Sequence, residues 1–518
     1  MKNCLLALLL AVLTACQVNP VTGERNLQFY DSDWEQQIGA SMYAPMRQSQ
    51  GGDFKLDADL TQYVQSVGQR LAQQARRKDE LQYEFRVLND STPNAWALPG
   101  GKIAINRGLL TELDSEAELA AVLGHEIVHA DAAHGARAQS KGMLTQIGAI
   151  AGMVLIDSKV DSSAGKQAAA IIPAIGAQLI NTKYGRDAER ESDYYGMQYM
   201  SEAGYNPQGA VELQETFVRL SEGRPDDWLS GLFASHPPSR ERVELNRETA
   251  AALPEGGDRG EQRYQQATRY LREVKPAYDA YDAALKLAGE EKYDESRAEL
   301  VKAMKIEPRE ALFHALDGDL HAEAKNTRRA FQAFDRAVDR DPEFFYHLLR
   351  RGHLALDLGR KADARADLQA SIDLLPTARG HYLLGNLDRD DGELESARAH
   401  YEQAAQSDSE TGAKAERELI LMDISNEPGK YVATGPAVDN YGRVYCLLGN
   451  RTRVNLSGIQ LNTAFVDDQG SVRRDRQSFS GVLEAGQQDR MATAWSTSNS
   501  SDLGQKVQCE VAAARVVD

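Results

Sequence analysis

Two histidines and a glutamate form the pattern His-Glu-x-x-His at His125, Glu126 and His129. An α-helix turns by about 100° per residue, so residues four apart share one face and both imidazoles can reach one ion. Tetrahedral zinc accepts neutral imidazole and keeps a position open for water in catalytic sites. Glu126 is then placed to take the proton of a water whose pKa the metal lowers. The pattern predicts metal-assisted hydrolysis of a carbonyl compound.

The motif must stand on a helix for this chemistry to work. Residues 115–123 supply acidic residues early and good helix formers throughout, as a helix that leads into the motif should. His134 follows His129 by five residues, which places it about 140° around the same helix. We therefore expect His134 to be structural or to support a ligand, and not to share the ion.

A third ligand is expected further along the chain. Glu189 and Asp193 are four apart on an expected helix, so both can point at one site. One of them would bind the metal and the other would orient a ligand histidine through its free ring N–H. The alternative is a solvent-facing charged surface of that helix.

The spacing of apolar residues before the motif changes from a helical to a strand period. Residues 32–47 and 56–76 are expected to be helical, and residues 81–87 alternate as a half-buried strand does. Residues 94–105 predict two extended pieces joined by a Pro-Gly-Gly turn. In zinc peptidases of this layout an edge strand holds the substrate backbone by strand addition. The residues predicted for that role are Asn94, Ala95, Trp96 and Ala97, with an ordinary hairpin as the alternative.

Two apolar stretches follow the motif, residues 142–156 and 168–180. Neither reaches the roughly 20 residues that span a bilayer. We expect a helical hairpin that packs on the hydrolase domain or leans on a membrane surface.

The first residues have the plan of a secretory signal peptide, with Lys2 before a short apolar run and Leu-Thr-Ala-Cys at residues 13–16. This last segment resembles a bacterial lipobox, which implies cleavage after residue 15, lipid on Cys16 and, with Gln17 behind it, the outer membrane. An uncleaved anchor is the alternative. Export leaves Cys446 and Cys509 in the folded part, either paired in an oxidising periplasm or as two unpaired buried thiols.

Length and charge limit the function classes. The 518 residues suggest about three domains. The formal net charge is −18 and the chain has no sustained basic run to neutralise phosphates, which argues against nucleic acid as a partner.

Beyond residue 263 a helical pattern repeats every 34 residues. Prolines 308, 342 and 376 end successive units, glycines recur at 318, 352 and 385, and alanines recur at 330, 364 and 397. This resembles the tetratricopeptide repeat, with about four repeats over residues 275–406. Their concave face would suit extended peptides or partner proteins. The alternative is a spacer that packs against the hydrolase domain.

From about residue 426 the chain alternates as short strands. Gly, Asn, Asp and Ser turns separate residues 444–448, 454–456, 459–462, 482–483 and 507–511. We predict a small β-sandwich. The sequence leaves open whether it binds carbohydrate, an envelope polymer or a protein.

A family resemblance joins these segments. The His125-Glu126-x-x-His129 motif, followed by Glu189-x-x-x-Asp193, resembles the HtpX and CAAX-prenyl-protease family of zinc metallopeptidases, especially its soluble periplasmic members. Residues 19–23, 94–101 and 107–110 also resemble recurring segments of that family, and the likeness covers roughly residues 16–250. It implies one zinc ion per chain, bound by His125, His129 and Glu189, with Glu126 as the catalytic base and Asp193 orienting a ligand. Ser192 stands where the family more often has Ala.

The segment from Ser235 to Arg242 resembles the family's late His-Pro segment. This resemblance gives His236 a catalytic role near the metal. It would either stabilise the oxyanion or occupy the open coordination position in a latent form. Arg242 is expected to pair with a carboxylate of the site.

The resulting prediction is a multidomain protein. It has a signal peptide (1–15), a lipidated tether and helix (16–54), a mainly α zincin (minigluzincin) protease domain with a small β-sheet (55–262), a tetratricopeptide-repeat solenoid (263–425) and a β-sandwich-like domain (426–518). We expect a periplasmic zinc endopeptidase, attached to the membrane by the Cys16 lipid, that acts on unfolded or misassembled envelope proteins recruited by the repeats. The alternative is a chaperone or assembly factor that works through its repeats, with latent proteolysis.

Overall fold

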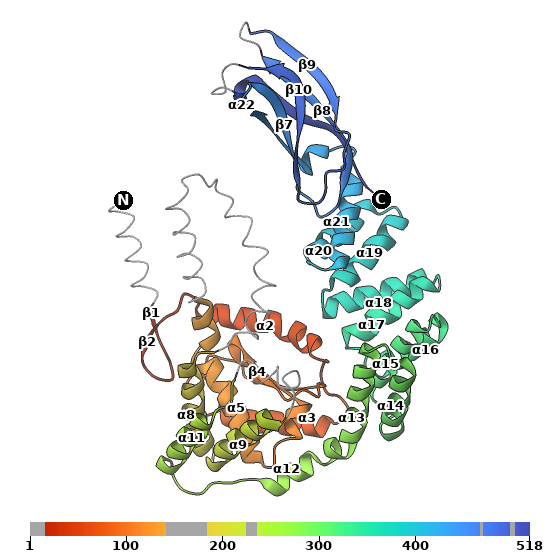
Figure 1. Ribbon diagram of the computed structural model, residues 1–518. Helices are drawn as coiled ribbons and strands as arrows, with labels where there is room; N and C mark the ends of the chain where they lie inside the picture. Colours follow the sequence, from red (N-terminus) through yellow and green to blue (C-terminus); the bar gives the residue numbers. More distant parts are fainter. Residues whose placement is uncertain (1–15, 141–183, 224–235, 467–469, 498–502, 518) are drawn as a thin grey trace, which may run out of the picture. The chain divides into compact units, whose positions relative to one another are not determined.

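The computed structural model describes residues 16–140, 184–223, 236–466, 470–497 and 503–517 (Figure 1). The chain divides into two compact units, Met1–His347 and Leu348–Asp518. The predicted signal peptide and the predicted hairpin of residues 142–180 lie outside the described residues.

A small three-stranded sheet lies in the first unit. Its order is β3-β5-β4, with β3 (Glu84–Leu88) parallel to β5 (Lys102–Asn106) and β4 (Ala95–Leu98) antiparallel to it. The turn η1 (Pro99–Gly101) joins β4 to β5, so the two extended pieces and their Pro-Gly-Gly turn are present as predicted. β4 is an edge strand of this sheet.

Helices cover both faces of this sheet. α3 (Ala58–Ala72) and α5 (Glu116–Asp131) pack on one face, and α2 (Ser32–Ser49) packs on the other. The alternation of strand side chains divides the core accordingly. Phe85, Val87, Ile103 and Ile105 belong to the large core that contains α3 and α5, whereas Trp96 and Leu98 pack with α2. α2 approaches η1 closely, since a Cβ added at Gly39 would lie 1.9 Å from the Pro99 carbonyl oxygen.

The motif helix α5 starts at a cap formed by two residues. The Ser115 hydroxyl accepts the backbone N–H of Glu118 at 3.1 Å, and the Glu118 carboxylate accepts the backbone N–H of Asp114 at 3.2 Å. Side chains at the start of a helix thus satisfy N–H groups that have no partner within the helix. The short helix α4 (Arg107–Leu110) connects β5 to this cap.

The close packing of two helices brings the carboxylates of Glu189 and Asp193 to the motif. α8 (Arg186–Glu202) packs against α5 (Figure 1), and two glycines lie at their contact. A Cβ added at Gly196 would lie 3.0 Å from the backbone nitrogen of His125, and one added at Gly124 would lie 3.1 Å from the Gly196 carbonyl oxygen. The two backbones can approach this closely because neither residue has a side chain. α9 (Gln208–Gly223) and α11 (Arg240–Ala252) complete this part of the unit.

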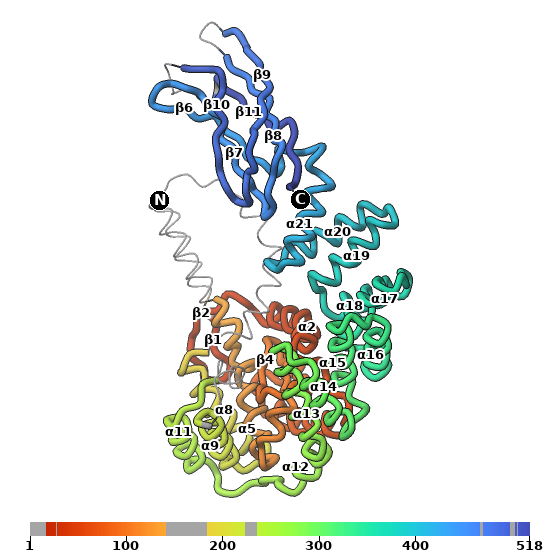
Figure 2. Tube along the Cα trace, turned by 45° about the vertical axis from the view of Figure 1, so that its right-hand side comes forward, coloured from red at the N-terminus to blue at the C-terminus, as the bar shows by residue number. Residues whose placement is uncertain are grey.

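Eight helices of residues 269–405 form four successive pairs, and the predicted repeat solenoid is confirmed (Figure 2). A Cβ added at Gly318 would lie 2.5 Å from the Phe334 ring, and one added at Gly385 would lie 2.7 Å from the Tyr401 ring, so these repeated glycines make room for the paired helix. The short helix α12 (Glu261–Ala267) precedes the pairs. The eight helices are α13 (Arg269–Gly289), α14 (Tyr293–Ile306), α15 (Ala311–Glu323), α16 (Thr327–Arg340), α17 (Phe345–Asp357), α18 (Lys361–Leu374), α19 (Ala378–Asp390) and α20 (Leu394–Ala405).

The first repeats share a hydrophobic core with the domain that carries the motif. Tyr264, Tyr278 and Phe313 belong to the same buried cluster as the core of α3 and α5. The Arg107 guanidinium lies 3.3 Å from the centre of the Tyr278 ring, and Asn89 donates to the Glu310 carboxylate at 3.1 Å. The division into units therefore falls within the repeats, whereas the sequence pattern suggested a boundary at residue 262.

The last part of the second unit is a β domain preceded by α21 (Glu410–Asp423) and η3 (Pro428–Lys430). It has two three-stranded antiparallel sheets, of order β10-β7-β6 and β11-β8-β9, and a disulfide joins Cys446 of β7 to Cys509 of β11. The strands are β6 (Val432–Val438), β7 (Arg443–Asn450), β8 (Leu456–Val466), β9 (Val472–Ser478), β10 (Gln488–Ser496) and β11 (Val507–Val516), with the short helix α22 (Leu503–Lys506) before β11.

The strands differ in detail from the sequence pattern. Residues 456 and 459–462 belong to one strand, β8, and Leu483 forms only an isolated bridge with Leu456. β9 and β10 were not predicted. Most of their side chains are exposed and polar or charged, so they lack the alternating apolar pattern by which a half-buried strand is recognised.

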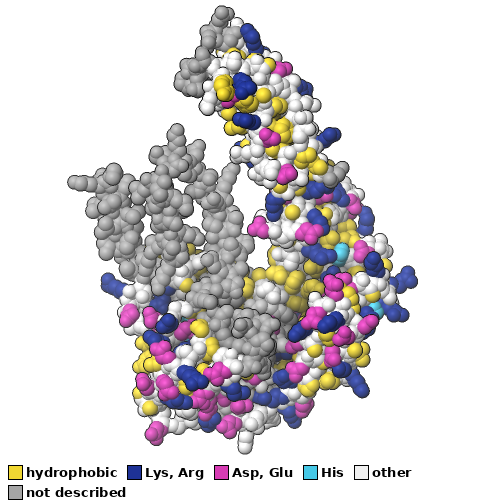
Figure 3. All heavy atoms as spheres, in the orientation of Figure 1, with side chains coloured by type: hydrophobic (Ala, Val, Ile, Leu, Met, Phe, Trp, Pro, Cys, Tyr) yellow, Lys and Arg dark blue, Asp and Glu magenta, His cyan; other side chains and the backbone are white. Residues whose placement is uncertain are grey.

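The N-terminal segment, predicted as a turn-rich tether, begins with a β-hairpin. β1 (Cys16–Val18) pairs antiparallel with β2 (Arg25–Leu27). Within the described part of the chain, no helix is long and apolar enough to cross a membrane. Over the surface of the first unit, acidic and basic side chains are intermixed on the face drawn in Figure 3.

Candidate metal centre

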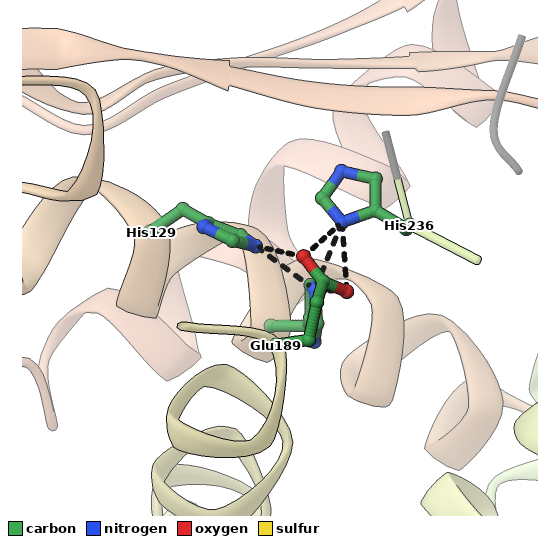
Figure 4. A group of neighbouring side chains, drawn as sticks. His129, Glu189 and His236 are labelled. Atoms are coloured by element: carbon green, nitrogen blue, oxygen red, sulfur yellow. Dashed lines mark hydrogen bonds and ion pairs between the residues drawn. The ribbon is translucent and has the colours of Figure 1, made fainter. Parts of the chain in front are cut away.

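Four buried side chains meet where α5 and α8 cross. His125, His129, Glu189 and His236 each offer one ligand atom, and these atoms all lie within 4.8 Å of one another. Figure 4 shows His129 and His236 pointing from different parts of the chain toward the Glu189 carboxylate. The structure thus brings together the three predicted metal ligands and the predicted catalytic histidine.

The three predicted ligands face one point. The Nε2 atoms of His125 and His129 lie 3.0 Å apart, and the Glu189 carboxylate oxygens lie 3.6 Å and 3.5 Å from them. Two imidazole nitrogens and one carboxylate oxygen are a donor set that suits zinc. Burial lowers the pKa of His129 well below its usual value, which favours the neutral imidazole that a metal requires.

Asp193 and Arg242 lie behind His125. The His125 Nδ1 atom is 2.9 Å from Asp193 Oδ1, so this carboxylate accepts the ring N–H and leaves Nε2 directed at the cluster. Burial alone would raise the pKa of Asp193, but Arg242 and His125 beside it hold that pKa below its ordinary value. Arg242 also lies 3.1 Å from Glu189 Oε2, and it is the expected partner of a site carboxylate.

Glu126 is 2 % exposed and borders a small cavity. Burial raises the pKa of its carboxyl group, partly offset by His236 and His125. The cavity has a volume of about 30 Å³, and its walls also include Met197, Leu213 and Phe217. The Glu126 carboxylate is therefore shielded from bulk water.

His236 contacts both carboxylates. Its Nδ1 atom lies 3.0 Å from Glu189 Oε1 and 3.3 Å from His125 Nε2, while its Nε2 atom lies 3.7 Å from Glu126 Oε1. Burial by itself would lower the pKa of His236, but the carboxylates of Glu189 and Glu126 raise it above its usual value. By these distances the Nδ1 atom of His236 lies among the ligand atoms, where it could act as a fourth metal ligand.

Two further rings surround the cluster. His134 lies outside the four-residue group, with Nδ1 2.8 Å from His129 Nδ1, in the supporting position that its place on the helix suggested. Tyr184, which sequence reasoning missed, stacks on His129 with ring centres 4.1 Å apart. Its position directly before the α8 segment was the only signal in the sequence.

Among the described strands, the predicted substrate strand β4 has a neighbour on one side only. Ala95 and Ala97 lie on the sheet face that packs with α5, whereas Trp96 points to α2 and donates to Gln50 at 3.0 Å. Asn94 lies just before β4, and its carbonyl oxygen accepts the Asn106 N–H. Cys16, the predicted lipid site, is the first residue of β1.

Two histidines and a glutamate from two packed helices, with a buried glutamate beside them, form the kind of group that could hold the metal ion of a metallopeptidase. Residues 58–250 match the model of Peptidase family M48, and the chain carries a domain of this family.

Named relatives agree with this assignment. The chain is 32% identical over 239 residues to a mitochondrial metalloendopeptidase OMA1 of Schizosaccharomyces pombe, covering 46% of this chain and 66% of that protein, just under two thirds of its length. It is 26% identical over 387 residues to the beta-barrel assembly-enhancing protease of Escherichia coli, covering 65% of this chain and 75% of the relative. A solved structure of MamA from Desulfovibrio magneticus is similar at 22% identity and a TM-score of 0.27, covering 30% of this chain and 88% of the other.

Proposed function

We propose that this protein is a zinc-dependent endopeptidase, with one zinc ion held by His125, His129 and Glu189. The observation that carries the proposal is the buried group of four ligand atoms within 4.8 Å, with Glu126 directly beside it. The paired supports of the histidines, Asp193 behind His125 and His134 behind His129, are typical of metal sites. If the ion were purely structural, the buried Glu126 beside it would have no catalytic role.

A zinc ion held by His125, His129 and Glu189 would supply Lewis-acid chemistry, lowering the pKa of a water molecule and polarising a carbonyl group. Glu126 takes the proton from the attacking water and passes it to the leaving amine. The substrate backbone would align along residues Asn94, Ala95, Trp96 and Ala97 by adding a strand to the side of β4 that no described strand occupies.

His236 controls access in this proposal. With Nδ1 among the ligand atoms it blocks the position that water needs, which gives a latent enzyme. In an open state His236 would instead lie beside the substrate and stabilise the developing oxyanion. The two roles expected of His236 then belong to two states.

We place the enzyme in the bacterial periplasm, attached to the outer membrane by lipid on Cys16, where it acts in protein quality control. The names of the relatives, a beta-barrel assembly-enhancing protease among them, support substrates that are unfolded or misassembled envelope proteins. The repeats would recruit these proteins or a partner, and nucleic acid is not expected as a partner.

A second candidate is an assembly factor that works through its repeats and cleaves rarely. The position of His236 favours it, because a fourth protein ligand silences hydrolysis. The repeats also share a core with the peptidase domain, so a bound partner could act on that domain directly.

The test is cleavage of an unfolded protein by the full chain, comparing wild type, Glu126→Gln and His236→Ala at equal zinc content. We expect Glu126→Gln to retain zinc and to lose about 100-fold or more of the rate, as removal of a general base does. Cleavage by His236→Ala above the wild-type rate supports latency. If all three bind zinc and none cleaves, even with partner proteins added, the assembly-factor function replaces the peptidase.

A further inference from the structure

The N-terminal hairpin reaches the helix that carries Glu189. Asn19, in the turn between β1 and β2, donates from Nδ2 to Glu191 Oε1 at 2.6 Å, although the two residues are 172 positions apart. Asn19 is 3 % exposed. A residue that the sequence assigns to a tether is thus buried against α8.

The direction of the Asn19 amide is fixed by its own turn. Its Oδ1 accepts the backbone N–H groups of Val21 and Thr22 at 2.9 Å and 3.3 Å. Its backbone N–H donates to the Glu24 carbonyl at 2.7 Å, and its carbonyl accepts the Gly23 N–H at 2.9 Å. With Oδ1 committed to the turn, the NH2 group of the side chain must point outward, where Glu191 accepts it.

Glu191 connects the hairpin to His134. Its Oε1 atom lies 3.3 Å from His134 Nε2, and its other oxygen accepts a bond from Arg137 at 3.4 Å. His134 is 2 % exposed. The charged group that faces its Nε2 atom is the Glu191 carboxylate. The hairpin therefore holds the carboxylate that faces this ring.

His134 in turn faces a proposed zinc ligand. Its Nδ1 atom lies 2.8 Å from His129 Nδ1, and two ring nitrogens at this distance must share one hydrogen. His129 Nε2 points at the ligand cluster and must be free of hydrogen to bind a metal, so Nδ1 of His129 carries the hydrogen and donates it. His134 then carries its own hydrogen on Nε2, the atom that lies 3.3 Å from Glu191 Oε1 at ion-pair distance, although the geometry does not form a hydrogen bond.

We propose that Asn19, Glu191 and His134 are positioning residues of the metal site, which hold His129 in the ring orientation and tautomer that bind zinc. This rests on the proposed function. It extends the site to the first residues after Cys16, so that the hairpin next to the predicted lipid becomes part of the metal centre. His125 and His129 are then supported separately, His125 by Asp193 and His129 by the hairpin through Glu191 and His134.

The experiment measures zinc affinity of the full chain by competition with a chromogenic chelator. The variants are Asn19→Ala, Glu191→Gln, His134→Leu and His134→Gln. Their controls are Asn26→Ala on β2 and Glu202→Gln at the far end of α8. Melting of the metal-free proteins is recorded in parallel, so that general loss of structure is separated from loss of affinity.

We expect His134→Leu and Glu191→Gln to weaken zinc binding about 10- to 100-fold, the usual effect of removing a group that supports a metal-binding histidine. Asn19→Ala should lower affinity in the same direction but less, and the controls should bind as wild type does. His134→Gln should recover part of the loss, because an amide offers both an acceptor and a donor. The double variant His134→Leu with Glu191→Gln should be no weaker than His134→Leu alone, since both act through one chain of contacts.

A spectroscopic reading separates positioning from packing. In zinc-loaded protein with ¹⁵N-labelled histidine, the His129 signals should show hydrogen on Nδ1 in wild type and an altered Nδ1 shift in His134→Leu. Wild-type affinity and unaltered His129 signals in the Glu191 and His134 variants would overturn the inference while leaving the proposed function intact. Equal losses in variants and controls would overturn it as well. A wild-type chain that binds no zinc would remove the proposed function itself.

Discussion

Arg242 donates a hydrogen bond to each oxygen of Asp193, with Nε 2.7 Å from Oδ2 and Nη2 2.7 Å from Oδ1. Asp193 Oδ1 also accepts the ring N–H of His125, so one carboxylate joins α8, α11 and the motif helix. Ser239, at the start of α11, caps that helix by accepting the Arg242 N–H. The helix that follows His236 therefore also fixes the support of a proposed zinc ligand.

Removing Arg242 should cost much stability. Arg242→Ala leaves the carboxylate of Asp193, which is 9 % exposed, without its main positive partner, and such a break costs about 3–5 kcal/mol. Arg247 lies on the same helix with a half-exposed side chain, so we expect Arg247→Ala to change the free energy of unfolding by about 0.5 kcal/mol or less. Denaturant unfolding of the first unit measures both. Equal effects of the two substitutions would contradict the prediction.

The carboxyl group of Glu118 should make stability depend on pH. Burial at the α5 cap raises its pKa from 4.5 to about 7, partly offset by the Asp114 N–H. The folded state thus binds this proton more tightly than the unfolded chain does. The contribution to stability is complete below pH 4.5 and is lost as the pH rises to about 7.

Glu118→Gln removes this dependence. The amide can still accept the Asp114 N–H, since Gln serves in this type of helix cap. We expect the variant to be more stable than wild type at pH 8, by about 2 kcal/mol, and similar to it at pH 4. Thermal melts across this range give the answer, and parallel pH profiles of the two proteins would show that the carboxyl group does not titrate as described.

The close packing of the repeats predicts a size limit at Gly318. An added methyl group would meet the Phe334 ring at 2.5 Å, and overpacking of this kind costs about 1–3 kcal/mol. Gly289, near the end of α13, has no atom within 4 Å of an added Cβ, so Gly289→Ala should be neutral or slightly stabilising. Chemical unfolding monitored by helical circular dichroism compares the two. A Gly318→Ala protein as stable as wild type would contradict the prediction and show that α15 and α16 can accommodate the methyl group.

The disulfide should stabilise the β domain by joining its two sheets. Cys446 and Cys509 lie 63 positions apart, and losing such a bond typically costs about 2–5 kcal/mol. We expect Cys446→Ala with Cys509→Ala to lower the melting temperature of the second unit and to leave zinc binding unchanged. Reduction of the wild-type protein should give the same shift. No shift in either case would argue that the bond adds nothing to stability.

Much of the architecture follows from local pattern. The helical run before His125 and its Ser115 cap lie within one element, and the spacing of two histidines on one helix face is fixed by helix geometry alone. The repeats could be recognised because each period carries its own glycine, alanine and proline. These features depend on residues that are close in sequence, which is why the sequence was sufficient to predict them.

Tertiary structure decided what surrounds the site. The crossing at Gly124 and Gly196 brings Glu189 to the histidines, and nothing in the local pattern of α5 or α8 states that the two glycines meet. The same is true of Tyr184 on His129 and of Asn19 on Glu191, which join segments far apart in the chain. Strands β9 and β10 also needed the fold, because their exposed polar side chains are held by backbone pairing rather than by an apolar face. The sequence by itself determined which residues could bind a metal, and only the packing of distant elements decided which groups hold them in place.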